Sequence, residues 1–153
     1  MSKIRLIQHA KGAPGLRFLG LGPNLLPAKG LKKLQKLLDK HAFWARGRTL
    51  SQLKSLLARS TQVVSLWQGN HLIGFGRATS DGIFRAVLWD IVVDEDLQRL
   101  GLGRKVVNAL LDTPAINSTE KIYLMTTNST NFYKQLGFQP ANKQELLVLD
   151  KKK

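Results

Sequence analysis

The sequence predicts an α/β protein in which helices flank a mixed, mostly antiparallel sheet. Three observations favour this class: two helical stretches within residues 28–60, three β-rich runs separated by short turns, and a strand that leads through a glycine turn into another helix. A length of 153 residues with 43% hydrophobic content is typical of one domain. We therefore expect a single domain, residues 1–153, with a basic helical part, residues 1–60, and a core over about residues 62–140.

The N-terminal third is predicted to be mainly helical. A short strand at residues 4–8 leads into a Gly- and Pro-rich stretch, residues 11–28, which we expect to be irregular. Leucines at helical spacing over residues 28–40 lie on one face and lysines on another, which is typical of an amphipathic helix. Thr49 followed by Gln52 is a capping-box pattern and predicts the start of a second helix.

The rest of the chain alternates strands and helices. Short turns separate three runs rich in β-branched and aromatic residues, so we expect successive antiparallel strands at residues 63–67, 72–78 and 84–93. The elements expected after these are a helix that ends near residue 114, a strand at 121–125, a short helix at 131–136 and a last strand at 146–149. The pattern as a whole predicts one mixed sheet.

Composition excludes several kinds of chemistry. The chain has no cysteine, which excludes disulfides, thiolate metal sites and an acyl-cysteine intermediate. His9, His41 and His71 lack the spacing of metal ligands, so no metal site is expected. No apolar run approaches the roughly 20 residues that span a membrane, and the N-terminus lacks the apolar segment of a signal peptide. We therefore expect a cytoplasmic protein.

Positive charge is concentrated in the N-terminal part. The net charge is +14, and residues 1–60 contain 13 Lys or Arg residues against the single acid Asp39. Such a surface suits nucleic acid, an acidic protein, a membrane surface or a polyanionic cofactor, and a solvated face explains it as well. The sequence contains no recognisable nucleic-acid-binding module, so nucleic acid is not the favoured partner.

The rest of the chain is organised around residues 90–104. A β-branched run ends at Val93, an apolar helical stripe begins at Val106, and Gly101 and Gly103 lie where that helix starts. A helix start offers unpaired N–H groups and a positive dipole end, and glycine lets a diphosphate approach closely. Two such glycines equally suit a simple tight turn. The stretch contains neither a nucleotide-binding P-loop nor a full dinucleotide fingerprint. A diphosphate bound here is therefore expected to belong to a ligand other than those that these two motifs bind.

Two motifs in order resemble the GNAT acetyltransferases. The first is Gln98-x-x-Gly101-x-Gly103 after the strand, and the second is Phe-Tyr-Lys-Gln-Leu-Gly-Phe at residues 132–138. The resemblance covers about residues 62–140 and is greatest to the cyanobacterial and plastid branch, which includes plant serotonin N-acetyltransferases. It implies the GNAT fold and an acetyl-CoA-binding core over those residues.

Residues 88–94, Leu-Trp-Asp-Ile-Val-Val-Asp, carry the resemblance to that branch. The resemblance implies direct acetyl transfer from acetyl-CoA to a primary amine in a ternary complex. A small arylalkylamine such as serotonin or tryptamine is the first choice of acceptor, and protein lysine or an N-terminal amine is the alternative. The positive charge disfavours polyamines unless Asp90 and the acids at residues 94–96 form a local acidic pocket.

The resemblance also implies which residues hold acetyl-CoA. The diphosphate binds backbone N–H groups of the glycine turn, and the pantetheine arm follows a bulged strand that splays from its neighbour. Thr126 stands where many family members have Asn or Asp, so Asn128 is expected to replace that contact. The cofactor-binding residues implied are Ile91, Val92, Val93, Gln98, Arg99, Leu100, Gly101, Leu102, Gly103, Arg104, Asn128, Phe132 and Tyr133.

Two residues are candidates for catalysis. By resemblance, the Tyr133 hydroxyl protonates the departing thiolate, and the alternative is aromatic packing beside Phe132 and Phe138. Asp90 is an acid in an apolar strand, where burial would raise its pKa and suit it to accept the amine proton, directly or through water. A structural hydrogen bond is the alternative for Asp90.

The acceptor is expected near Phe43 and Trp44. These rings lie between the first two helices, where the family's loop borders the acceptor site, so they are predicted to bind the acceptor together with Asp90; core packing is the alternative. Two other function classes remain open: a non-catalytic acyl-CoA sensor, and a basic protein that binds nucleic acid or an acidic partner through its lysine-rich helix. A homodimer also remains open, because many family members dimerise.

Overall fold

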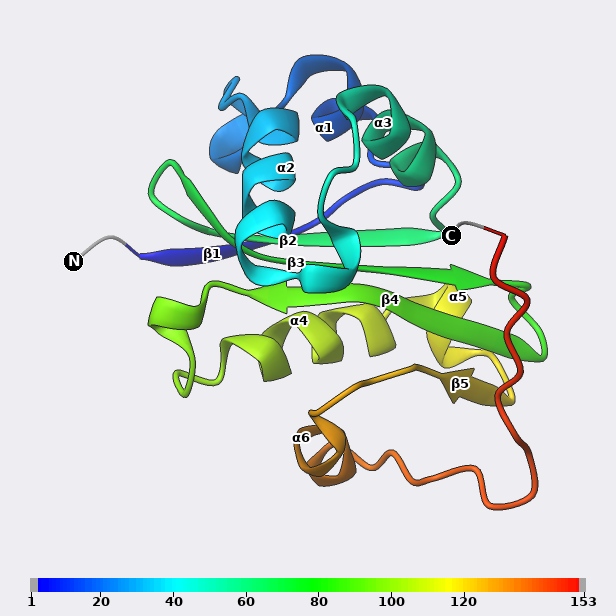
Figure 1. Ribbon diagram of the computed structural model, residues 1–153. Helices are drawn as coiled ribbons and strands as arrows, with labels where there is room; N and C mark the ends of the chain where they lie inside the picture. Colours follow the sequence, from blue (N-terminus) through cyan, green and yellow to red (C-terminus); the bar gives the residue numbers. More distant parts are fainter. Residues whose placement is uncertain (1–2, 152–153) are drawn as a thin grey trace.

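A five-stranded mixed sheet forms the centre of the computed structural model, which describes residues 3–151 (Figure 1). The strands lie in chain order; β1 to β4 are antiparallel to their neighbours, whereas β5 is parallel to β4. The strands are β1 (Ile4–Gln8), β2 (Gln62–Gln68), β3 (His71–Ser80), β4 (Arg85–Val93) and β5 (Lys121–Tyr123). The predicted mixed, mostly antiparallel sheet is confirmed.

Helices cover both faces of this sheet. Helices α1, α2 and α3 lie on one face, α4 and α5 lie on the other, and α6 lies next to the start of α4 (Figure 1). The α-helices are α1 (Pro14–Leu19), α2 (Gly30–His41), α3 (Leu50–Ala58), α4 (Leu102–Leu111), α5 (Pro114–Asn117) and α6 (Thr130–Gln135). The 3₁₀ turns are η1 (Pro23–Leu25), η2 (Phe43–Ala45) and η3 (Glu95–Leu97). Of the helices described, none is long and apolar enough to cross a membrane.

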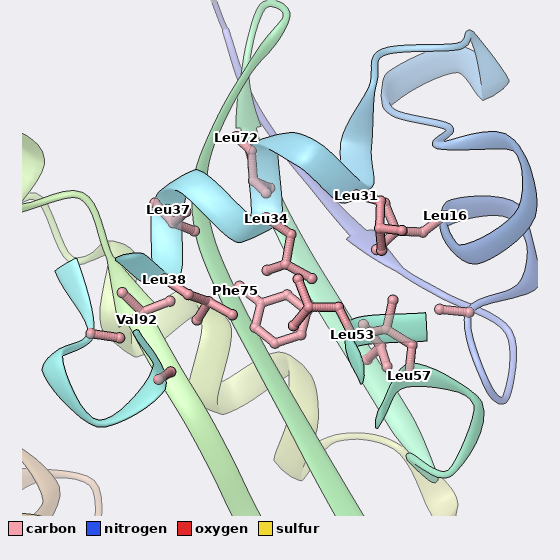
Figure 2. Close-up of a cluster of buried hydrophobic side chains, with 14 of the residues drawn as sticks. Leu16, Leu31, Leu34, Leu37, Leu38, Leu53, Leu57, Leu72, Phe75 and Val92 are labelled. Carbon is pink, nitrogen blue, oxygen red and sulfur yellow. The ribbon is translucent and has the colours of Figure 1, made fainter. Parts of the chain in front are cut away.

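Leucines at helical spacing build the core on the face covered by α1 to α3. Leu34 and Leu38 of α2 and Leu53 and Leu57 of α3 gather around Phe75 of β3, and all five side chains are buried (Figure 2). Burial of each such side chain stabilises the fold by roughly 1.5–3 kcal/mol. This packing fixes α2 and α3, and therefore the loop between them, against the sheet.

On the opposite face, α4 packs closely against β3. A Cβ added at Gly76 would lie 2.7 Å from Val106 Cγ1 and 3.1 Å from Leu110 Cδ1, so the absence of a side chain at Gly76 permits this approach. Val106 and Leu110 are fully buried. The close contact fixes the position of α4, whose start carries the predicted glycine turn.

Several local predictions hold and others do not. The capping box forms, because Gln52 N donates to Thr49 Oγ1 at 3.1 Å and Thr49 N donates to Gln52 Oε1 at 2.9 Å. Helix α1 lies within residues 11–28, which were expected to be irregular. Pro14 begins this helix and Gly20 caps its end, so these residues bound a helix here instead of preventing one.

The last predicted strand, residues 146–149, is wrong. The four apolar side chains in this stretch are 74–86% exposed. No neighbouring strand pairs with them in the part of the chain that the structure describes. The composition of the stretch suits a strand, but a strand also needs a partner edge in register, and β5 provides only three residues.

A bulge in β4 and a short β5 open the sheet. The register between β3 and β4 shifts between Phe75 and Arg77, opposite Asp90, which has a left-handed φ of 53°. Strand β5 pairs with β4 only as far as Val87 opposite Tyr123. Beyond that pair the two strands diverge. The bulge and the splay that the family resemblance implies are therefore present in this chain.

Candidate active site

A cavity of about 570 Å³ lies where β4 and β5 diverge. Its walls come from the loop around η2, from β3 and β4, from the segment after β5, from α6 and from the C-terminal segment. The lining residues are Phe43, Trp44, Arg48, Arg77, Leu88, Trp89, Asp90, Ile91, Leu124, Met125, Thr126, Thr127, Asn128, Ser129, Tyr133 and Leu146. The structure thus brings together Phe43 and Trp44 with Asp90 and Tyr133, from three stretches that lie far apart in the sequence.

Asp90 is anchored by three neighbours. Trp44 Nε1 donates to Asp90 Oδ1 at 3.1 Å, Arg77 Nε donates to Oδ2 at 2.8 Å, and Arg48 Nη1 lies 3.0 Å from Oδ2. The Asp90 side chain is only 3% exposed. Burial alone would raise the pKa of this carboxyl, but the two guanidinium groups outweigh burial and hold the pKa below its usual value.

The predicted rise in the pKa of Asp90 is therefore wrong. The sequence shows that Asp90 lies in an apolar strand, but it does not show that Arg48 and Arg77 meet the carboxylate there. An ionised, doubly paired carboxylate fits the alternative interpretation, in which Asp90 is a structural hydrogen-bond acceptor. Its contact with the Trp44 indole then orients a wall of the cavity.

Phe43 and Trp44 form an aromatic edge at the cavity. Their side chains are 55% and 49% exposed, and the rings meet edge to face with centroids 5.2 Å apart. Ordinary core packing, the alternative interpretation, does not describe two half-exposed rings. Trp89 of β4 also lines the cavity, and its indole N–H donates to Thr79 Oγ1 at 2.8 Å.

The start of α4 presents unpaired backbone donors. Arg99 and Gly101 have left-handed φ values of 71° and 74°, and the first hydrogen bond of the helix runs from Lys105 N to Gly101 O. Within residues 3–151, the N–H groups of residues 102–104 have no hydrogen-bond acceptor. A Cβ added at Gly101 would meet nothing within 4 Å, so the approach is open. This arrangement fits an anionic group such as a diphosphate.

The other predicted residues of the turn differ in what they expose. Gln98, Leu100 and Arg104 are exposed around the open N–H groups, whereas Leu102 is 3% exposed and packs in the core below α4. Gly103 lies against Phe132, whose ring would be 3.1 Å from an added Cβ. At Leu102 and Gly103, only the backbone is therefore available to a ligand.

The edge of β4 facing the cavity has no strand partner beyond Val87 in the described part of the chain. Ile91 lines the cavity, Val92 is buried in the core beneath α2, and Val93 is half-buried against the opposite core. Backbone groups of this edge, which no strand covers, are accordingly free to bind an extended ligand. This arrangement fits the pantetheine arm of a coenzyme A thioester.

Tyr133 of α6 lines the cavity between two other rings. It meets Phe132 edge to face at 4.9 Å and Phe138 at 5.9 Å between centroids. Burial raises the pKa of the Tyr133 hydroxyl above its usual value, so the hydroxyl keeps its proton at neutral pH. Phe132 does not line the cavity and supports the ring of Tyr133 and the turn at Gly103.

Thr126 and Asn128 both lie on the cavity wall. Ser129 N donates to Thr126 Oγ1 at 3.1 Å, and Ser129 Oγ lies 3.4 Å from Asn128 Oδ1. This bend turns the chain from β5 into α6. The replacement of the Thr126 contact by Asn128 stays a prediction.

The acids at residues 94–96 do not form an acidic pocket with Asp90. None of them lines the cavity. Asp94 lies 3.5 Å from His41 Nε2 and accepts from Asp96 N at 3.0 Å, so it caps η3. Sequence reasoning also missed Arg48 and Arg77. Arg77 was detectable as a charged residue inside an apolar strand, whereas no local signal identifies Arg48.

Comparisons with known proteins agree on the family. A sequence model of the acetyltransferase (GNAT) family matches residues 31–138. The chain is 37% identical over 113 residues to the "Uncharacterized N-acetyltransferase ycf52" of Pyropia yezoensis, which covers 71% of this chain and 64% of that relative. It is 38% identical over 118 residues to the "Histone acetyltransferase TAP1" of Glycine max, which covers 69% of this chain and 50% of that relative. The chain thus spans under two thirds of the length of these relatives.

A solved structure supports the fold independently. The GNAT-family acetyltransferase of Streptococcus pneumoniae superposes with a TM-score of 0.70 over 98% of this chain and 100% of that chain, at 17% sequence identity. This likeness concerns the fold alone. The match of the family's sequence model to residues 31–138 establishes that the chain belongs to the GNAT acetyltransferase family.

Proposed function

We propose that the protein transfers an acetyl group from acetyl-CoA directly to a primary amine in a ternary complex. The observation that carries this proposal is the continuity of the site. Open N–H groups at the start of α4 are followed by the uncovered edge of β4 and then by a cavity containing Tyr133. A diphosphate, an extended arm and a reactive thioester need these features in this order.

Residues of this chain supply three contributions to the reaction. The N–H groups at the start of α4 bind the diphosphate, aided by the exposed Arg99 and Arg104. The free β4 edge orients the arm. Acetyl-CoA itself supplies the activated acetyl group, and a backbone N–H of β4 directed at the thioester oxygen would stabilise the negative charge that develops there.

Tyr133 is proposed as the proton donor to the leaving sulfur. The amine nitrogen forms a bond to the acetyl carbon, the carbon–sulfur bond breaks, and the thiolate takes the hydroxyl proton of Tyr133. Solvent then returns a proton to Tyr133 and accepts the proton that the amine loses. The raised pKa of Tyr133 keeps the hydroxyl protonated until charge develops on the sulfur.

The favoured acceptor is a small amine with an aromatic or apolar body. Phe43, Trp44 and Trp89 provide the aromatic surface that such a body would contact. Arylalkylamines such as tryptamine and serotonin satisfy this requirement. Protein lysine is the second candidate, and the printed name of the Glycine max relative, a histone acetyltransferase, favours it.

The test measures thiol release from acetyl-CoA with tryptamine, serotonin, polyamines and lysine peptides, together with acetyl-CoA binding by calorimetry. We expect binding and turnover with at least one amine. Tyr133→Phe is expected to lower kcat by about 100-fold, as loss of a general acid does, with acetyl-CoA affinity unchanged. Tyr123→Phe is the matched control, because Tyr123 lies on β5 and its hydroxyl contacts Gln144 at 3.2 Å outside the cavity.

Three results would contradict the proposal. Binding of acetyl-CoA without turnover of any amine would favour a non-catalytic sensor. Unchanged kcat in a folded Tyr133→Phe protein would remove the tyrosine from the chemistry. Absence of acetyl-CoA binding would overturn the assignment of the α4 turn.

A further inference from the structure

We propose that the amine acceptor carries a carboxylate close to its amino group and that Arg48 binds this carboxylate. This inference rests on the proposed acetyl transfer and concerns the substrate class of the same cavity. The observation behind it is the balance of charge in the walls. In the described chain, the charged residues lining the cavity are Arg48, Arg77 and Asp90, two cations and one anion.

Asp90 has little capacity left to bind a substrate ammonium group. Oδ1 accepts from Trp44, Oδ2 accepts from Arg77, and the same Oδ2 contacts Arg48. The side chain is 3% exposed. An ammonium group would have to displace one of these partners and would lie beside two guanidinium groups, which repel it. Asp90 therefore fixes the arginines instead of recognising a cation.

Arg48 has hydrogen-bonding capacity that the protein does not use. A guanidinium group has five N–H donors. Arg48 Nη1 is buried and forms an ion pair with Asp90 Oδ2 at 3.0 Å, but its alignment for a hydrogen bond there is poor, and no other acceptor among residues 3–151 receives a hydrogen bond from the Arg48 guanidinium. Arg48 is 28% exposed, whereas Arg77 is 12% exposed and already donates to Asp90. Arg48 is thus the more accessible cation, and arginine suits paired hydrogen bonds to a carboxylate.

The rest of the molecule favours the same acceptor class. The acids at residues 94–96 lie outside the cavity, and the chain has a net charge of +14, which attracts anionic molecules and repels polyamines. Neighbouring guanidinium groups also lower the pKa of an acceptor amine, because they disfavour its protonated form. A carboxylate-bearing amine would therefore be held by Arg48 and would present a larger neutral, nucleophilic fraction.

The test compares amines that differ by one carboxylate: tryptophan with tryptamine, and tyrosine with tyramine. We expect kcat/KM to be about tenfold higher or more for the carboxylate-bearing member, as a charge-assisted hydrogen bond allows. Arg48→Gln should abolish this ratio while the KM for acetyl-CoA stays unchanged. Arg46→Gln is the matched control, because Arg46 lies on the same loop, is exposed and does not line the cavity.

A binding measurement separates this inference from the proposed function. N-acetyltryptophan and N-acetyltryptamine are titrated calorimetrically into the protein saturated with coenzyme A, which requires no turnover. Tighter binding of N-acetyltryptophan that Arg48→Gln removes would support the carboxylate site even if no amine were acetylated. Equal or weaker binding, or turnover that favours tryptamine and survives Arg48→Gln, would overturn the inference while leaving acetyl transfer intact.

Discussion

Acidification to pH 5 is expected to destabilise the fold through His9. His9 follows β1, its Nε2 lies 2.7 Å from Ser65 Oγ, and Trp67 Nε1 donates to the same oxygen at 2.8 Å. The Ser65 hydroxyl can therefore donate its own hydrogen to a neutral His9. Burial lowers the pKa of His9 from 6.5 to about 4.

The expected loss of unfolding free energy follows from the difference between the pKa values of His9 in the folded and the unfolded chain. Above pH 6.5 His9 is neutral in both the folded and the unfolded chain, so it contributes no pH dependence. Between pH 6.5 and about 4 the unfolded chain binds a proton that the folded chain does not, and the free energy of unfolding falls with falling pH. At about 1.4 kcal/mol per pH unit, the loss is about 2 kcal/mol at pH 5 and levels off near 3 kcal/mol below pH 4.

Urea unfolding at pH 7.5, 6, 5 and 4.5 measures this loss directly. His9→Gln is expected to remove most of the decline between pH 6.5 and 5, since glutamine does not titrate. His71→Gln serves as the control, because His71, the first residue of β3, is exposed, so this substitution should leave the decline unchanged. An equal decline in the wild-type and His9→Gln proteins would refute the reasoning.

Two substitutions test the site. Asp90→Asn leaves Arg48 and Arg77 without their carboxylate and should cost roughly 3 kcal/mol of unfolding free energy in urea titrations. The fall in rate at acidic pH should be the same in the Asp90→Asn and wild-type proteins, because the lowered pKa of Asp90 keeps its carboxylate ionised in the wild type over this pH range. Loss of this fall in the variant would restore the general-base role of Asp90. Gly101→Trp should weaken acetyl-CoA binding by about tenfold or more in calorimetry, because the side chain fills the approach to the N–H groups of α4. Gly82→Trp, at a similar φ of 78° with open space around it, is its control, and equal affinities in the two folded variants would contradict the diphosphate assignment.

Local signals in the sequence predicted most of the fold. The Thr49 capping box, the leucine spacing of α2 and the glycine turn before α4 each act within a few residues, so they are readable from one stretch of chain. Features that depend on distant partners were not readable. Residues 146–149 have the composition of a strand but lack a partner, and this information does not lie in the stretch itself.

In the candidate site, too, the features within one stretch of sequence were predictable and those that depend on distant partners were not. Gly101 and Tyr133 lie within motifs, and the structure places Gly101 at the start of α4 and Tyr133 on the cavity wall, while their roles stay predictions. The error over Asp90 arose because its partners come from other elements: Trp44 lies 46 residues away and Arg77 lies 13 residues away in the chain. Burial and ion pairing shift the pKa of a carboxyl in opposite directions, so its strand environment alone does not fix the sign.

The bulge at Asp90 links the architecture of the sheet to the proposed specificity. Aspartate tolerates a left-handed φ better than most residues, so position 90 can interrupt the β3–β4 register at modest cost. At this point β4 no longer pairs with β5, and the Asp90 carboxylate contacts Trp44, Arg48 and Arg77. Asp90 thereby anchors the aromatic edge of the cavity. Its single carboxylate also pairs with two guanidinium groups, so the cavity wall keeps an excess of positive charge. Because Asn also accepts a left-handed backbone, Asp90→Asn separates these roles: the open edge of β4 should persist, while the charge balance that selects the acceptor changes.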